Sequence, residues 1–210
     1  MTHYKRFICN PLQENTYIIW DDCTHDAAIV DCGAYSTAER TDISDFIQTE
    51  TLHPVLALQT HMHFDHIFGL GWLKETYGLR PICHAAEQEN YDMQDVMASE
   101  MFGVTMTLAR PAVERYVADG DLLQLGDSTL TVIHTPGHSA GGVCYLTEDF
   151  LLSGDTLFAG SCGRTDLPGG NMNDEAHSIK HKILTLQPHI TVLPGHGPET
   201  SIARERRYWM

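Results

Sequence analysis

The residues of greatest chemical interest are His61-Met62-His63-Phe64-Asp65-His66, where three imidazoles and one carboxylate lie within six positions. A purely structural role would not favour such a set, because polar rings buried without partners destabilise a protein by several kcal/mol. His61 and His63 are two residues apart and can point to the same side of an extended segment. Asp65 and His66 begin a helix, where a carboxylate suits the free N–H groups. The turn thus presents two pairs of donors in different directions, which suits two adjacent metal ions better than one.

Three further donors follow apolar strands: His138 after residues 128–135, Asp155 after residues 150–154, and His196 after residues 190–193. Because active sites of sheet proteins collect where strands end, we expect these side chains to meet those of the first turn. Together the donors are five histidines and two aspartates, with no thiolate. Structural zinc sites are typically closed and rich in cysteine, whereas catalytic ones use histidine and carboxylate and leave one position open. The donor set therefore predicts a catalytic metal site.

The periodicity of apolar residues predicts the strands and helices that would position these donors. Runs rich in Ile, Val and aromatic residues predict strands over 4–9, 15–20, 27–31, 55–60, 81–84, 121–125, 128–135, 142–147, 150–154 and 190–193. Helices are predicted after a Ser36-to-Glu39 capping box, over 67–77, over 85–101, and from a cap at Asn173 to a stop at Pro188. Residues 102–118 and 155–171 are expected to be loops, and a short basic tail ends the sequence.

Two features each admit two interpretations. Met93, Met97 and Met101 recur every four residues, and they form either an ordinary packing stripe or an adaptable apolar wall or lid beside a substrate. Arg164 lies in a glycine-rich segment after Asp155. It either binds a substrate carboxylate in a bidentate manner or pairs with a neighbouring acid such as Asp166.

The composition indicates a soluble, cytoplasmic protein of one domain. No run approaches the ~20 apolar residues of a membrane span, and residues 1–10 lack the apolar core of a signal peptide. The formal charge of −15 argues against a nucleic-acid partner, because such binding needs a basic surface. The six cysteines include no C-x-x-C pair and are expected to be reduced, with Cys9, Cys83 and Cys144 in the core.

Five motifs together resemble the metallo-β-lactamase superfamily, and within it the glyoxalase II-like branch (hydroxyacylglutathione hydrolases and their short relatives). The residues that carry the resemblance are His61-x-His63-x-Asp65-His66, Thr135-Pro136-Gly137-His138, Ser153-Gly154-Asp155-Thr156-Leu157-Phe158, Cys162-Gly163-Arg164-Thr165-Asp166 and Pro194-Gly195-His196-Gly197. The resemblance implies an α/β (α+β) fold, a four-layer αβ/βα sandwich that forms a single domain over residues 1–210. The metals would lie at one edge, between two sheets.

The resemblance also implies roles for the donors. One metal would be held by His61, His63 and His138, a second by Asp65, His66 and His196, and Asp155 would bridge them. Two ions about 3.5–4 Å apart lower the pKa of a shared water, and the resulting hydroxide would attack the carbonyl of a small thioester or ester. Asp65 and Asp155 are then the catalytic carboxylates. Arg164 falls where the family has a basic residue that contacts glutathione, which makes it the expected substrate-binding residue.

The expected cofactors are two divalent ions, zinc first and iron or manganese as alternatives, because imidazole and carboxylate accept all three. The expected partner is a small-molecule substrate such as a glutathione thioester, with no nucleic acid and no membrane, and the chain is expected to be a monomer or homodimer. The segment 162–166 also resembles the persulfide dioxygenases of the superfamily, which use one iron, held here by His61, His138 and Asp155. A non-catalytic metal-binding protein is the third hypothesis.

Overall fold

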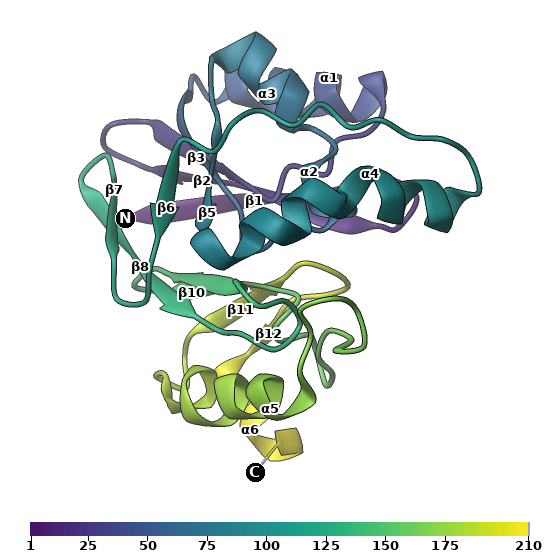
Figure 1. The fold of residues 1–210 in the computed structure, drawn as a ribbon. Helices are drawn as coiled ribbons and strands as arrows, with labels where there is room; N and C mark the ends of the chain where they lie inside the picture. Colours follow the sequence, from purple (N-terminus) through teal and green to yellow (C-terminus); the bar gives the residue numbers. More distant parts are fainter. Residues whose placement is uncertain (210) are drawn as a thin grey trace.

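Two six-stranded β-sheets lie face to face in the structure, a computed structural model that describes residues 1–209 (Figure 1). The first sheet contains, in spatial order, β1 (Thr2–Cys9), β2 (Glu14–Asp21), β3 (Asp26–Val30), β4 (His53–Leu58), β5 (Pro81–His84) and β6 (Arg115–Val117). The second contains β12 (Thr200–Ser201), β11 (Thr191–Pro194), β10 (Phe150–Gly154), β9 (Val143–Leu146), β8 (Ser128–His134) and β7 (Leu122–Leu125).

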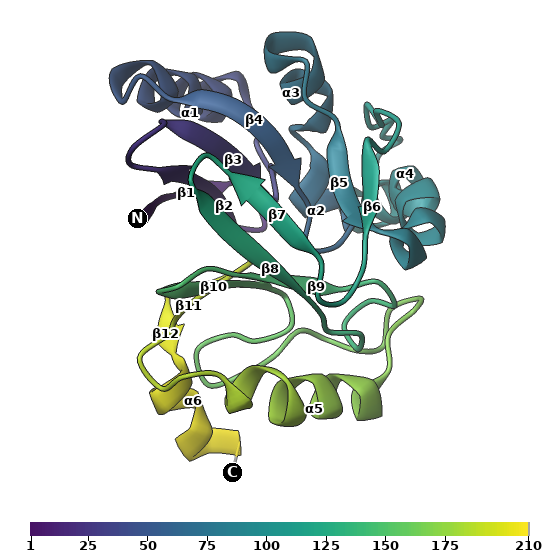
Figure 2. The same ribbon diagram turned by 90° about the vertical axis from the view of Figure 1, so that its left-hand side faces the viewer.

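Helices cover the outer faces of both sheets, as the two views show (Figures 1 and 2). The helices α1 (Thr37–Thr49) and α3 (Leu70–Tyr77) lie on the first sheet, and α5 (Met172–His181) and α6 (Ile202–Trp209) lie on the second. The short α2 (Phe64–Ile67) and the longer α4 (Gln88–Phe102) lie at one end, near the boundary between the two halves. The predicted four-layer αβ/βα arrangement is therefore confirmed.

Strand direction gathers several loops at one edge. The strands β3, β4, β5 and β6 are parallel, and so are β10 and β11. Because β8 is antiparallel to β9 and β9 is antiparallel to β10, β8 runs in the same direction as β10. The loops after β3 and β4 thus leave the first sheet in one direction, and those after β8, β10 and β11 leave the second sheet in one direction. The predicted donors follow β4, β8, β10 and β11.

The alternation of side chains along each strand explains why the sheets are covered on both faces. In β2, Tyr17 and Ile19 point into the apolar layer between the sheets, whereas Ile18 points outward. Ile18 shares its cluster with Ile43 and Ile47 of α1. The predicted capping box begins this helix: Ser36 Oγ accepts from Glu39 N at 3.2 Å, and Glu39 Oε2 accepts from Ser36 N at 2.7 Å. Cys9, Cys83 and Cys144 are buried free thiols, as predicted.

The predicted helix over 67–77 is wrong in its outline, because the structure has two helices, α2 and α3, separated at Phe68 and Gly69. The Gly69 amide donates to Cys32 O at 2.8 Å, and a Cβ at Gly69 would collide with the Cys32 thiol. The chain therefore bends where it packs against the loop after β3. The predicted cap of α5 is also wrong by two residues, because the side chain of Asn171, rather than that of Asn173, accepts the amides at the start of this helix.

Three short elements, β6, β12 and α6, were not predicted. The strand β6 lies inside the expected loop 102–118 and pairs in parallel with β5. The expected basic tail is instead the helix α6, in which Arg206 donates to Leu184 O and Leu186 O at 2.7 and 2.5 Å. Within residues 1–209, no helix has both the length and the apolar composition to cross a bilayer.

Candidate metal centre

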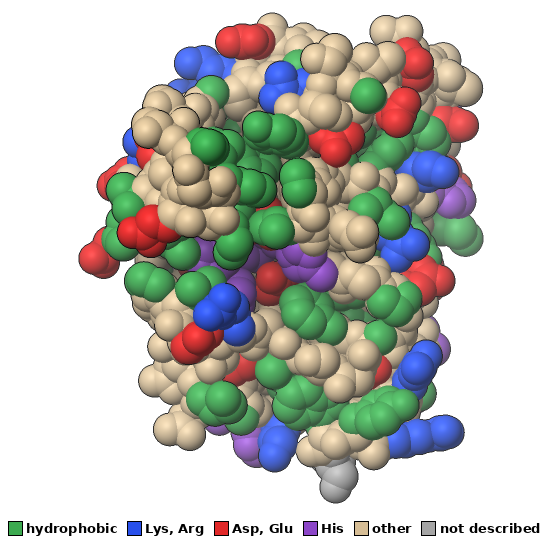
Figure 3. All heavy atoms as spheres, turned by 90° about the vertical axis from the view of Figure 1, so that its right-hand side faces the viewer, with side chains coloured by type: hydrophobic (Ala, Val, Ile, Leu, Met, Phe, Trp, Pro, Cys, Tyr) green, Lys and Arg blue, Asp and Glu red, His purple; other side chains and the backbone are tan. Residues whose placement is uncertain are grey.

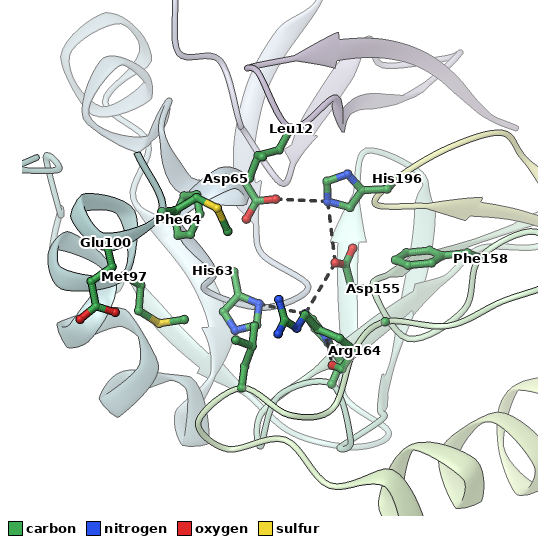
Figure 4. Close-up of a pocket in the computed structure, with 14 residues that line it drawn as sticks. Leu12, His63, Phe64, Asp65, Met97, Glu100, Asp155, Phe158, Arg164 and His196 are labelled. Carbon is green, nitrogen blue, oxygen red and sulfur yellow. Dashed lines mark hydrogen bonds and ion pairs between the residues drawn. The ribbon is translucent and has the colours of Figure 1, made fainter. Parts of the chain in front are cut away.

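The donors predicted from the sequence meet at the edge where the strands end. Figure 4 shows His63, Asp65, Asp155 and His196 among them. The donors come from four segments that are distant in sequence: residues 61–66, which hold His61 and His63 after β4 and Asp65 and His66 in α2, and the loops after β8 (His138), β10 (Asp155) and β11 (His196). The side chains are buried or nearly so, and His196 is the most open at 25% exposure. All seven predicted donors are brought together, while their binding of metal remains a prediction.

His61, His63 and His138 form the first group. Each offers a ring nitrogen, and these nitrogens lie within 4.8 Å of one another. His63 Nδ1 and His138 Nε2 are 2.8 Å apart. Two imidazole nitrogens at this separation need either a proton or a cation between or beside them, and neutral imidazole nitrogens are good ligands for a cation.

Asp65, His66 and His196 form the second group, with ligand atoms again within 4.8 Å of one another. His196 Nε2 lies 3.2 Å from Asp65 Oδ2. Asp155 stands between the groups: its Oδ1 is 3.5 Å from His66 Nε2, and its Oδ2 is 3.6 Å from His138 Nε2. One carboxylate therefore faces both groups: Oδ1 is directed to His66, and Oδ2 lies near His138 and, at 3.8 Å, near His196 Nε2.

Several buried donor atoms lack a hydrogen-bond partner within residues 1–209: Nε2 of His61, of His63 and of His66, and Oδ1 of Asp155. Such orphaned atoms are rare in folded proteins, because each costs about 1–3 kcal/mol when it is left unsatisfied. Here the orphaned atoms belong to the two groups and to the carboxylate between them. The residues present therefore fit two cations.

The electrostatic environment favours the protonation states that bind metal. Burial works to raise the pKa of Asp155, but the neighbouring histidines His66, His138 and His61 together outweigh it and hold this pKa well below its usual value. Burial, with the nearby His138 adding to it, lowers the pKa of His63 to about 3. Burial also lowers the pKa of His61 well below its usual value. At neutral pH the carboxylate is thus ionised and these two imidazoles are neutral.

His66 behaves in the opposite way. Burial works to lower the pKa of His66, but the carboxylates of Asp65 and Asp155 raise it well above its usual value. Behind the ring, Asp31 Oδ2 lies 3.2 Å and Glu14 Oε1 3.9 Å from His66 Nδ1. Burial raises the pKa of Glu14 well above its usual value, although the nearby His66 acts against this shift. Without metal, His66 is therefore protonated. A bound cation would take the place of this proton and supply the positive charge that the two carboxylates require.

Residues outside the predicted metal-ligand set hold the imidazole rings in place by hydrogen bonds. Asp31 accepts from Thr60 N at 2.7 Å and from Thr60 Oγ1 at 2.6 Å, and Thr60 Oγ1 lies 3.0 Å from His61 Nδ1. Likewise, His138 Nδ1 lies 2.7 Å from the carbonyl oxygen of Arg164. A partner on Nδ1 fixes the ring and leaves Nε2 as the ligand atom, as in most metal sites. The sequence analysis did not identify Asp31.

A buried carboxylate, Glu87, connects the segment of His61 and His63 with the loop that carries His138. Its Oε2 accepts from the amide of Met62, which lies between His61 and His63, at 2.8 Å. Its Oε1 accepts from the amide of Gly141, in the loop that carries His138, also at 2.8 Å. Glu87 was not singled out by the sequence analysis either, because a single acid at the start of a helix gives no spacing signal.

The loop of His196 is held by β2. Asn15 Nδ2 donates to Pro194 O at 2.8 Å and to Gly197 O at 2.9 Å, one on each side of the histidine. Gly195 is required for close approach, because a Cβ there would collide with Asp155 Oδ1 and the His66 ring. The second group is thus assembled by a glycine that leaves room and an amide that fixes the turn.

A pocket of about 580 Å³ opens above the donors. Figure 3 shows this face, with histidine side chains at the bottom of a hollow that hydrophobic side chains border. Met97 and Met101 line the pocket, which supports the interpretation of the methionine stripe as an apolar wall beside a substrate; Met93 lies outside it. Arg164 also lines the pocket, and it donates to both oxygens of Asp166 at 2.7 and 2.8 Å. The ion pair considered from the sequence is therefore present.

Comparison with known proteins agrees with this fold. The family model described as the Metallo-beta-lactamase superfamily matches residues 9–196. "Probable metallo-hydrolase YqgX" of Bacillus subtilis is 37% identical over 205 residues, which cover 97% of this chain and 94% of the relative. "Hydroxyacylglutathione hydrolase GloC" of Haemophilus influenzae is 31% identical, with coverages of 93% and 91%.

Two solved structures share both fold and sequence with the chain. The BLEG-1 B3 metallo-beta-lactamase superposes with a TM-score of 0.87 at 36% identity, and the match covers 98% of this chain and 97% of that one. TTHA1623, solved in a di-iron-bound form, superposes with a TM-score of 0.83 at 32% identity, with coverages of 97% and 98%.

Proposed function

The chain belongs to the metallo-beta-lactamase superfamily, and we propose that it is a binuclear metallohydrolase that cleaves a small thioester or ester. The observation that carries this proposal is the position of Asp155, which directs one oxygen to His66 and the other to His138. A carboxylate shared in this way is needed only if both groups of donors are filled. If the site held one iron, the second group, Asp65, His66 and His196, would bind no metal.

Two divalent ions supply, when bound, a water that is activated near neutral pH and a Lewis acid for the carbonyl oxygen. The chain contributes two carboxylates beside that water, Asp65 and Asp155. Burial works to raise the pKa of Asp65, but His66 and His196 together bring it below its usual value, so Asp65 is ionised as well. An ionised carboxylate at either position would accept a hydrogen bond from a water in the pocket and orient it. His196 stands at the more exposed side, where the carbonyl of the substrate approaches.

Zinc is the proposed metal, with iron or manganese as alternatives, because a donor set of imidazole and carboxylate accepts all three. The related structure TTHA1623 was solved in a di-iron-bound form. Support for a thioester comes from the relative GloC, which is named a hydroxyacylglutathione hydrolase. Arg164 is the proposed substrate-binding cation: it lies at the exposed mouth of the pocket, where a substrate carboxylate could exchange with that of Asp166.

The proposal is tested on protein purified without added metal. Metal content is measured, and the protein is assayed with S-lactoylglutathione, a thioester of N-acetylcysteamine, a persulfide with recording of oxygen uptake, and a β-lactam. We expect about two metal ions per chain, thioester hydrolysis and no oxygen uptake. The β-lactam is included because a relative bears the name of a β-lactamase.

The variant Asp155→Ala provides the decisive comparison. Loss of the shared carboxylate should leave at most one ion per chain and lower turnover by at least about 100-fold. Asp149→Ala is the matched control, because Asp149 is an exposed residue just before the same strand, β10. One iron per chain with oxygen uptake on the persulfide would identify a persulfide dioxygenase instead. Metal binding without turnover of any substrate would identify a non-catalytic protein.

A further inference from the structure

One side of the pocket is an apolar wall formed by Leu12, Phe64, Met97 and Met101. Leu12 comes from the loop between β1 and β2, Phe64 from α2, and the two methionines from α4. Figure 4 shows Leu12, Phe64 and Met97 on the same side of the donors, with Phe64 directly after His63 in the chain. The wall therefore begins at the floor of the pocket, next to the metal centre, and extends to its mouth.

The apolar wall has accessible surface. Met101 is 55% exposed although it is a large apolar side chain, and Leu12 and Met97 are half-buried. Phe158 and Leu167 line the pocket as well, from the long loop after β10. Flexible, polarisable methionines beside a preformed cavity adapt to apolar ligands of varied shape. The lining therefore suits an apolar group that reaches down to the metal centre.

The charges at the mouth of the pocket do not favour an anionic substrate. Apart from the histidines of the metal centre, Arg164 is the one basic side chain among the described residues that line the pocket. It is already bound to both oxygens of Asp166. Glu100, an exposed acid on α4, lines the same pocket. These three side chains at the mouth sum to a charge of −1, so a substrate carboxylate reaches Arg164 only by displacing Asp166 and gains no net attraction from this group of side chains.

We propose that the pocket binds an apolar acyl group, so that the preferred substrates are thioesters or esters of short- to medium-chain acids rather than of a hydroxy acid such as lactate. This inference rests on the hydrolytic function proposed above. The leaving group must pass to solvent through the polar mouth, which places the acyl group against the apolar wall. A hydroxyl on the acyl group would lose its hydrogen bonds to water next to Phe64 and Met97, and this loss disfavours its binding.

A series of N-acetylcysteamine thioesters tests the proposal, because this small uncharged thiol leaves the acyl group as the only variable. Acetyl, butyryl, hexanoyl and lactoyl thioesters are compared on the metal-loaded protein. Each methylene buried against the wall should raise kcat/KM by up to about 4-fold. We therefore expect at least about a tenfold rise from acetyl to hexanoyl, and a lactoyl thioester that is poorer than the butyryl one.

Variants of the methionine stripe localise the effect. Met97→Ser is expected to reduce the ratio of kcat/KM for hexanoyl over acetyl by about 5-fold, because it removes apolar surface from the wall. Met93→Ser is the matched control: Met93 lies one turn earlier on α4, is 38% exposed and faces away from this pocket. The ratio in this control should equal that of the unmodified protein. Because the ratio compares two substrates on one preparation, it is independent of metal loading.

A second measurement does not depend on turnover. With ¹³C-methyl-labelled methionine, NMR should show the methyl signals of Met97 and Met101 shifting when hexanoate is added, while the Met93 signal stays in place. Lactate at the same concentration should shift none of the three.

The outcomes separate this inference from the proposed function. If thioesters are hydrolysed but acetyl and hexanoyl react equally, or if Met97→Ser leaves the ratio unchanged, the acyl preference is overturned and the hydrolase stands. If hexanoate shifts Met97 and Met101 but no thioester is hydrolysed, the apolar pocket stands and the proposed function is overturned.

Discussion

At the scale of single residues, the metal centre depends on side chains that orient the donors from behind. Asp31 is the clearest case, because its carboxylate accepts two hydrogen bonds from Thr60 and lies 3.2 Å from His66 Nδ1. Its backbone φ is +50°, a left-handed conformation that is uncommon for a residue other than glycine. Such strain is kept only where the surroundings enforce it, and here it lets one carboxylate contact the segments of both donor groups.

Replacement of Asp31 by asparagine should weaken metal binding without removing a donor. Loss of an orienting carboxylate typically lowers metal affinity by about 10–100-fold, and we expect a decrease in that range for zinc, measured by competition with a chromophoric chelator. Asp26→Asn, at the other end of β3, is the control that should keep the affinity of the unmodified protein. Equal affinities for both variants would show that Asp31 has no role in holding the site.

The sequence predicts the metal-ligand residues well, but it does not predict the residues that orient them, and the reason is physical. The donors are chemically unusual residue types that each follow an apolar strand, so His138, Asp155 and His196 are visible without a structure. Asp31 and Glu87 are single acids whose importance arises only when distant segments fold against them. Their partners, Thr60 and Gly141, are 29 and 54 positions away in the chain, and a single sequence carries no signal for such pairs.

At the scale of secondary-structure elements, Glu87 connects the turn after β4 with the loop after β8. It is fully buried, and it accepts the amides of Met62 and Gly141 on different oxygens. Gly141 is required here, because a Cβ at this position would collide with the Glu87 backbone and side chain. The connection sets the distance between the histidines of the first group, since Met62 lies between two of them and Gly141 follows the third.

Glu87→Ala should destabilise this connection. It leaves two buried amides without an acceptor, and each is expected to cost about 1–3 kcal/mol of the free energy of unfolding. Thermal unfolding of the metal-free protein measures the loss, and zinc titration should show weaker binding at one of the two sites. The control is Glu89→Ala, an exposed acid two residues further along. An unchanged melting temperature in Glu87→Ala would contradict the assigned role.

Elements with a strong local pattern were predicted, and those formed by tertiary contact were not. The helix α1 has its capping box and apolar stripe in the sequence, and it was found where expected. The strand β6 has three residues and exists because β5 offers it a parallel edge. The helix α6 has a charged composition, and it is fixed by Arg206 on the carbonyls of Leu184 and Leu186. Local periodicity cannot report contacts of this kind.

At the scale of the whole molecule, the site lies between two sheets, so its geometry depends on how the sheets are joined. At the opposite end from the metal centre, Asp21 at the end of β2 accepts from Ser128 Oγ of β8 at 2.6 Å. The same carboxylate accepts the amides of Cys23 and Thr24 at 3.0 Å. The bond from Ser128, together with these amides, lowers the pKa of Asp21 to about 2, although burial acts against them.

This shift predicts a contribution to stability that depends on pH. A carboxylate with a lower pKa in the folded state stabilises the protein fully above its unfolded pKa of about 3.9, and the contribution is lost as the pH falls to about 2. The melting temperature of metal-free Asp21→Asn should therefore lie below that of the unmodified protein at pH 7, and the gap should narrow between about pH 4 and pH 2. Asp45→Asn, at an exposed position of α1, should show no such gap. A gap that is constant with pH would contradict the prediction.

The central claim is that the whole fold brings two groups of donors and one shared carboxylate together around a pair of cations. Anomalous X-ray diffraction at the zinc absorption edge, from crystals of zinc-loaded protein, tests it most directly. We expect two peaks about 3.5–4 Å apart, one beside His63 and His138, the other beside His66 and His196, with the carboxylate of Asp155 between them. A single peak, or two peaks of which neither contacts Asp155, would contradict the account.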